Sequence, residues 1–164
     1  MRLLGIVLST LLIMASGTIS NAKDEGFSGK WVLDKNADPS PNAPVGLISK
    51  IKQDGSRVTI ESTFKEPANG LVPLLYLGVM TTQLKLSLDG QPEQNQIGPF
   101  QMAAKTTVNG NQMDTDWTAE VKGDQVQGHW THTLDSDGKH MTLEIKESST
   151  QGQAGQATLR FIKK

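Results

Sequence analysis

Short turn signals built on glycine recur along this chain and restrict it to a hairpin-rich fold. Glycine, with Asn or Asp before it, tolerates the positive φ that a tight β-hairpin turn requires. Six such signals predict at least seven strands, most of them joined to the next by a tight turn. The signals are Asp54-Gly55, Asn69-Gly70, Asp89-Gly90, Asn109-Gly110, Lys122-Gly123-Asp124 and Asp137-Gly138.

Between these turns, apolar residues alternate with polar ones, at the period of two that is typical of strands with one buried face. Consecutive strands joined by tight turns pair antiparallel, and a long meander protects its edges best by closing on itself. We therefore predict an all-β fold, a single antiparallel up-and-down (meander) β-barrel of about 8–10 strands. The apolar side chains predicted to face inward are Val58, Ile60, Phe64, Leu84, Leu86, Leu88, Met113, Trp117, Ala119, Val121, Val126, Trp130, Leu134, Met141, Leu143, Ile145, Leu159 and Phe161.

The first 22 residues have the composition of a cleavable signal peptide. Arg2 supplies a positive charge, Leu3 to Ala15 form an apolar stretch, and Ser20 to Ala22 place small residues where a signal peptidase reads them. The apolar stretch is shorter than the ~20 residues that a membrane span needs. We expect cleavage after Ala22 and a periplasmic or secreted domain of residues 23–164, with no transmembrane segment.

Composition excludes several classes of function. The chain has 164 residues, 16 Lys and Arg against 17 Asp and Glu, and no cysteine. A nearly balanced charge lacks the basic excess of a nucleic-acid-binding protein, so we expect no nucleic-acid partner. Without cysteine there is no disulfide, no thiolate metal site and no cysteine nucleophile.

Two segments break the alternation. Leu71 to Met80 is an almost uninterrupted apolar run, and Gln91 to Pro99 is polar and interrupted by proline and glycine. The apolar run fits a buried strand or a short helix that plugs one end of the barrel. It also fits a lid over a cavity, or a patch that contacts a membrane or a partner protein.

The first predicted strand carries a motif with a family resemblance. Gly29-Lys30-Trp31-Val32-Leu33 resembles the opening of the calycin superfamily, which includes the lipocalins and the fatty-acid-binding proteins. The resemblance implies that Trp31 closes one end of the barrel and that a basic residue of the last strand lies across it. Arg160 is the residue that matches this role.

A second resemblance covers most of residues 23–164. The segments Gly29 to Asp34, Leu134 to Thr142 and Phe161 to Lys164 are similar to those of a largely uncharacterised family of small exported bacterial proteins. That family is described as lipocalin-like. The resemblance implies a fold and export, and it transfers no catalytic residue.

The histidines are the first candidates for chemistry. His129 and His132 are three residues apart, so on a strand they face opposite sides and cannot share a metal ion. The parity of the strand places His132 inside and His129 outside, and His140 also reads as outward. His132 is either a core histidine bonded to an inward Thr or a buried water, or a ligand contact.

The acidic residues offer no site. Asp114 and Asp116 share the outer, solvated face, so we expect no paired acid–base role for them. Asp135-x-Asp137-Gly138 lacks the later ligands of a calcium loop and is explained by a hairpin. We predict no catalytic residue, no metal site and no cofactor.

The remaining candidates are inward aromatic, aliphatic and hydroxyl side chains. An eight-stranded barrel has room for its own side chains or for one small ligand. Ser49, Ser62 and Thr106 are further polar positions on the inner face. The predicted ligand-binding residues are Trp117, Trp130, His132, Met113, Thr115 and Phe64.

Three functions are compatible with this interior. The first is non-catalytic binding of a small, mostly apolar molecule inside the barrel. The second is a protein- or envelope-interaction module with a filled barrel, acting through Leu71 to Met80. The third, the least favoured, is a small barrel enzyme with His132 as its base.

Overall fold

The computed structural model describes residues 26–37, 43–65 and 81–164, and within these ranges the regular structure is entirely β. No helix in these ranges is long and apolar enough to cross a membrane. The strands are β1 (Gly29–Leu33), β2 (Ile48–Asp54), β3 (Arg57–Thr63), β4 (Thr81–Ser87), β5 (Asp89–Ile97), β6 (Phe100–Asn109), β7 (Gln112–Val121), β8 (Asp124–Leu134), β9 (His140–Ser149) and β10 (Ala154–Lys163).

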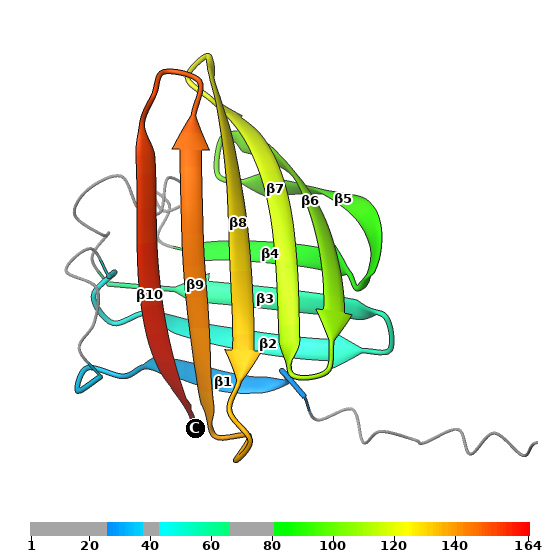
Figure 1. The fold of residues 1–164 in the computed structure, drawn as a ribbon, viewed down its shortest axis with the longest axis vertical. Coiled ribbons are helices and arrows are strands. Elements are labelled where there is room, and N and C mark those ends of the chain that lie inside the picture. Colours follow the sequence, from blue (N-terminus) through cyan, green and yellow to red (C-terminus); the bar gives the residue numbers. More distant parts are fainter. Residues whose placement is uncertain (1–25, 38–42, 66–80) are drawn as a thin grey trace, which may run out of the picture.

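The ten strands form one antiparallel sheet in the order β4-β3-β2-β1-β10-β9-β8-β7-β6-β5. β1 pairs with β2 on one side and with β10 on the other, and this contact between the first and last strands curls the sheet into a barrel. The long strands β6 to β10 form one wall, and β1 to β4 cross behind it (Figure 1). The predicted fold class, an up-and-down barrel of about 8–10 strands, is confirmed.

Strand parity determines which side chains form the core, as the alternation predicts. On β7, buried and exposed residues alternate along most of the strand, with Met113, Thr115 and Trp117 inside. Leu88 is the exception among the predicted inward residues, since it is only partly buried beside the core. The turn between β7 and β8 shows why glycine signals mark the hairpins: Lys122 and Gly123 have φ of 53° and 82°.

The segment predicted to break the pattern is in fact a strand. β5 covers most of the range Gln91 to Pro99, and it pairs with β6 with a register shift between Asp89 and Pro92. Most residues of β5 are polar and exposed, so its sequence shows almost no alternation of apolar and polar residues. Asn95 and Ile97 are its buried residues.

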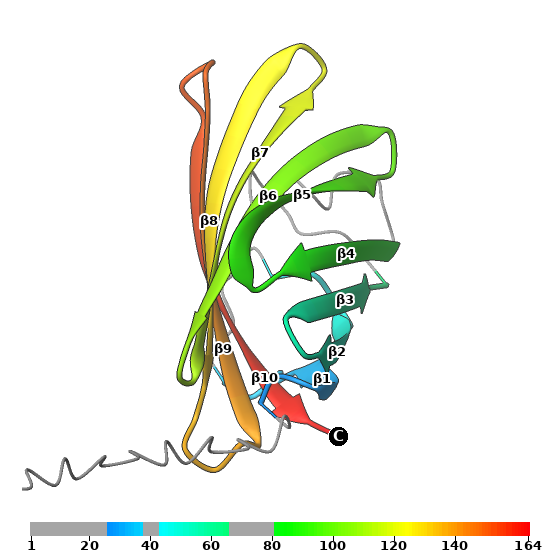
Figure 2. The same cartoon turned by 90° about the vertical axis from the view of Figure 1, so that its right-hand side faces the viewer.

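The sheet has two edges, β4 and β5, and they face each other across a seam without a backbone ladder. Figure 2 shows both edge strands on the same side of the barrel. The side chain of Asn95 crosses this seam. The backbone N–H of Lys85 donates to Asn95 Oδ1 at 2.7 Å, and Asn95 Nδ2 donates to the Lys85 carbonyl at 3.1 Å. One amide therefore makes the two hydrogen bonds that a neighbouring strand would make.

The indole of Trp31 on β1 is anchored to the segment just before the strand. This side chain is fully buried, and its Nε1 donates to the Phe27 carbonyl at 2.8 Å. The assignment of Arg160 as the basic residue across Trp31 is wrong, because Arg160 is exposed on the outer face of β10. Lys163 takes that place, with Nζ 5.3 Å from the indole centroid, since its parity on β10 is the inward one.

Three sequence predictions lie outside the described residues. These are the signal peptide of residues 1–22, the Asn69-Gly70 turn and the apolar run Leu71 to Met80.

Candidate functional site

The interior of the barrel contains a cavity between its two walls. Its volume, measured as the space open to the centre of a water molecule, is about 30 Å³. A cavity needs roughly 10–15 Å³ by this measure to hold one water, so this space fits one or two. Its lining consists of Ser49, Ile60, Ser62, Thr82, Leu84, Ile97, Trp130, His132, Leu143 and Ile145.

Most hydroxyl groups on the inner face are satisfied by a neighbour on the adjacent strand. Ser49 on β2 and Ser62 on β3 are register partners, and their Oγ atoms lie 2.8 Å apart. Thr106 on β6 and Thr115 on β7 form the same kind of pair at 3.0 Å. These pairs confirm the predicted inward polar positions and show that they bond to each other.

Two polar side chains of the cavity have no such neighbour. Trp130 Nε1 and His132 Nδ1 are buried and have no hydrogen-bond partner among the described residues. An unpaired buried donor or acceptor costs about 1–3 kcal/mol of stability. Thr106 and Thr115 bond to each other, so the predicted bond of His132 to an inward threonine or a buried water stays a prediction. Two polar atoms thus face a mostly apolar cavity with their hydrogen-bonding capacity unused.

Burial also controls the charge of His132. Desolvation lowers the pKa of its imidazole from 6.5 to about 4, against a weaker raising effect from the negative charge of Asp114. His132 is therefore neutral at pH 7. No hydroxyl or carboxylate among the described residues bonds its Nδ1.

The structure brings the predicted site residues into one region but not into one lining. Trp130 and His132 line the cavity. Thr115 and Met113 are their register partners on β7, and both are fully buried in the wall. Phe64 is buried just after β3. Of the six predicted residues, the cavity lining includes Trp130 and His132, and a contact with a ligand stays a prediction.

Trp117 supports the cavity wall from the side. Its ring centroid lies 5.4 Å from that of Trp130, with the planes inclined by 49°. Its indole covers Gly128, its register partner on β8. A Cβ at Gly128 would lie 2.3 Å from Trp117 Cε2, so only glycine lets this ring lie against the sheet. The position of Trp130 thus depends on a residue without a side chain.

Sequence reasoning missed two lining residues on the seam. Thr82 belongs to β4 and Ile97 to β5, the two edge strands. Thr82 lies two residues before Leu84 and four before Leu86, so all three share one face of the strand. This period of two is the signal that could have identified Thr82 as an inward residue. Ile97 lies in the polar segment Gln91 to Pro99, whose sequence does not indicate a strand. With Leu84, three of the ten lining residues flank the seam.

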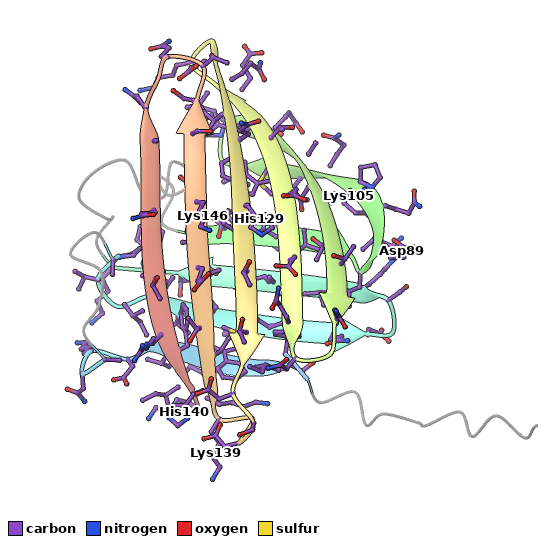
Figure 3. All side chains as sticks on the ribbon, in the orientation of Figure 1. Asp89, Lys105, His129, Lys139, His140 and Lys146 are labelled. Atoms are coloured by element: carbon purple, nitrogen blue, oxygen red, sulfur yellow. The ribbon has the colours of Figure 1, made fainter. Side chains whose placement is uncertain are left out.

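A second hollow lies on the outer surface, over β6 to β9. It is an open groove of about 670 Å³ that includes Lys105, Asp116, His129 and Lys146, and Figure 3 shows the labelled members of this set on the outside of the wall. His129 Nδ1 lies 2.7 Å from Asp116 Oδ1, and its Nε2 lies 3.2 Å from Thr131 Oγ1. These charges are solvent-exposed and partly paired with one another.

Metal binding finds no support in this geometry. Within the described ranges no group of three or more His, Asp or Glu side chains is arranged to hold a metal ion. Asp135 and Asp137 form the hairpin turn before β9, where Asp137 Oδ1 accepts the Lys139 N–H at 2.7 Å. That hydrogen bond lowers the pKa of the exposed Asp137 carboxyl, as capping of a turn does.

Comparison with known proteins places the fold. No protein-family model matches the chain, and no curated protein matches it in sequence. A secretory abundant heat soluble protein from Ramazzottius varieornatus matches in structure with a TM-score of 0.55 and 12% identity, over 85% of this chain and 96% of that one. Secretory abundant heat soluble protein 4 from the same organism matches with a TM-score of 0.52 and 15% identity, over 85% of this chain and 96% of that one. Fatty-acid-binding protein 1 of Echinococcus granulosus matches with a TM-score of 0.52 and 12% identity, over 85% of this chain and 98% of that one.

At these identities the likeness shows the fold alone. This chain shares the barrel fold of these structures, one of which is a fatty-acid-binding protein, and this is the fold that the Gly-x-Trp resemblance implies. The resemblance to exported bacterial proteins finds no support in the comparisons and stays an expectation.

Proposed function

We propose that this protein binds a small, mostly apolar molecule inside the barrel without transforming it. The observation that carries the proposal is the pair of unused polar atoms, Trp130 Nε1 and His132 Nδ1, facing a cavity lined mainly by apolar side chains. Ligand pockets have this composition: an apolar lining with a few polar anchors that orient the ligand. A structural neighbour named as a fatty-acid-binding protein shares the fold, which supports the choice of the interior.

The size of the cavity determines how a ligand enters. Drug-sized ligands occupy pockets of roughly 300–1,000 Å³, far more than the 30 Å³ present here. A larger molecule must therefore move a wall, and the seam between β4 and β5 is the wall that yields most easily. Opening it breaks two hydrogen bonds of Asn95 and no backbone ladder. Thr82, Leu84 and Ile97 would then part directly above the cavity.

Native mass spectrometry of the protein purified from its own host tests binding. The full chain is expressed, purified, and measured before and after incubation with a host lipid and metabolite extract. We expect a stoichiometric adduct that is lost on denaturation and weakened in Trp130→Leu. The matched control is Gln127→Ala on the outer face of the same strand, which should keep the adduct. An unmodified mass under both conditions would overturn the proposal.

A second candidate, an interaction module with a filled barrel, is favoured by the small volume of the cavity. It would use the apolar run Leu71 to Met80. Replacing Leu74 and Leu77 by serine should then abolish partitioning into vesicles or capture of an envelope protein. Retention of both by the variant, together with an adduct in the mass spectrum, would reject this candidate.

Export is part of the proposal and rests on the composition of residues 1–22. The intact mass of the purified protein measures it directly. Cleavage after Ala22 gives a chain that begins at Lys23, whereas a mass that includes residues 1–22 would reject export by this route.

A further inference from the structure

The charge inside the barrel restricts the chemistry of a ligand. Among the buried residues that the structure describes, the only Asp, Glu, Lys or Arg is Glu147. Glu147 shares the inward parity of Ile145 and Leu143 on β9. Among the described residues, the interior therefore offers no buried Lys or Arg to an anionic ligand.

Lys163, the basic residue nearest to the interior, is already engaged. Its Nζ lies 5.3 Å from the centroid of the Trp31 ring. The lining of the cavity includes neither residue. The ammonium of Lys163 is therefore held over Trp31 and is not part of the cavity wall.

The unused polar atoms favour one kind of ligand group. The indole N–H of Trp130 can only donate a hydrogen bond, and the imidazole of His132 can donate or accept through Nδ1. A carbonyl or ether oxygen accepts from such donors without a charge of its own. A carboxylate would lose its hydration on entering this apolar cavity and would find no counter-ion, which strongly disfavours the ionised form.

We infer that the interior selects uncharged molecules with a hydrogen-bond-accepting oxygen, such as ketones, esters or ethers, over carboxylates of the same length. This inference rests on the proposed binding function. It separates this chain from a fatty-acid carrier on the basis of its own residues: the donors are Trp130 and His132, and the cavity lining contains no Lys or Arg.

Three probes of equal carbon number separate the contributions: methyl butyl ketone, hexanoate and hexane. Each is titrated at pH 7 into the uniformly ¹⁵N-labelled protein, and the indole N–H signals of its three tryptophans are followed by NMR. We expect the ketone to bind about tenfold or more tightly than hexanoate, and about fivefold more tightly than hexane. The Trp130 signal should show the largest shift.

Two variants assign the selectivity to one hydrogen bond. Trp130→Phe keeps an aromatic ring and removes the donor, so the preference for ketone over hexane should vanish. Gln127→Ala, on the outer face of the same strand, is the matched control and should keep the preference. The ratio of the two affinities is the readout, so a change in stability or ring volume common to both probes cancels.

Each outcome has a separate meaning. Hexanoate binding as tightly as the ketone overturns the selectivity for uncharged ligands and leaves the binding function standing. Equal binding of ketone and hexane overturns the role of the acceptor oxygen. If none of the three probes shifts an indole signal, the proposed function fails, and the inference fails with it.

Discussion

The two faces of β8 place two histidines in opposite environments. His132 points into the barrel, is 5% exposed, and has no hydrogen-bond partner for Nδ1 within the described residues. His129, three residues earlier, points outward with its side chain 43% exposed, and both of its ring nitrogens lie near aspartate or threonine oxygens. Water and carboxylates satisfy the outer imidazole, whereas the inner one is neutral and unused. The same residue type is thus a surface ion-pair partner on one face and a candidate ligand contact on the other.

The largest expected effect that distinguishes the two faces is a dependence of stability on pH. The pKa of His132 is about 4 in the folded protein against 6.5 for an exposed imidazole. Between these values the unfolded chain binds a proton that the folded barrel excludes, so the free energy of unfolding falls as pH drops from 6.5 to 4. The loss should approach about 3 kcal/mol.

Urea unfolding at pH 7 and pH 4.5 measures this effect. His132→Gln should lose most of the difference, and His129→Gln should retain it. The variants must be compared with each other because other groups also destabilise the fold in acid. Hydrogen bonds from Ser87 and Thr150 lower the carboxyl pKa values of Asp89 and Asp124, and protonation of these carboxylates loses that stabilisation. Equal pH dependence of the two histidine variants would contradict the burial of His132.

A smaller effect comes from filling space on the inner face. Gly128→Ala should destabilise the barrel by about 1–3 kcal/mol, because the new Cβ overlaps the indole of Trp117. Gln127→Ala, the adjacent exposed position, should change stability by less than about 0.5 kcal/mol. Thermal unfolding of both variants tests the contrast. A neutral Gly128→Ala would mean that Trp117 does not lie against β8.

Removing the unused polar group should stabilise the protein while weakening the site. His132→Leu replaces an imidazole with an unpaired Nδ1 by an apolar side chain, so we expect a gain of about 1 kcal/mol at pH 7. Chemical denaturation measures the gain, and the ketone titration measures the loss of binding. A loss of stability would indicate that His132 has a hydrogen-bond partner in solution.

The smallest effect is expected at the outer histidine. His129→Gln removes an exposed contact with Asp116, and such surface contacts contribute about 0.2–1 kcal/mol at most. The loss of stability should be smaller in 0.5 M salt than at low salt, because salt screens interactions between exposed charges. Unfolding curves at low and high salt check this. A large, salt-independent loss would contradict a purely surface role.

Strand parity explains why so much of this fold could be predicted. The period of two requires no knowledge of which strands are neighbours, and it placed His132, Thr115 and Ser62 inside correctly. The polar strand β5 was missed because pairing with β6, and not apolar alternation, holds it in the sheet. The basic residue over Trp31 was assigned to Arg160 instead of Lys163 because a family role was matched by residue type before the register was known.

The size of the cavity was beyond prediction for a different reason. Strand parity predicts which side chains point into the barrel. The free volume inside depends instead on the distance between the two walls, which parity does not determine. The seam between β4 and β5 was equally hidden, since it depends on the side chain of Asn95 in a segment with little sequence signal.

The seam between β4 and β5 also offers a natural point at which to relocate the chain ends. The two described ends lie side by side, since Trp31 is the register partner of Lys163 and the Lys164 N–H donates to the Lys30 carbonyl at 2.8 Å. Joining residue 164 to residue 26 through a short linker, and cutting at Leu88, gives a circular permutant whose strands follow the sheet in sequence from β5 to β4. The pairing of β1 with β10, the longest-range ladder in the native order, then becomes a local hairpin. Because low contact order speeds folding, the permutant should reach the same barrel faster than the native chain.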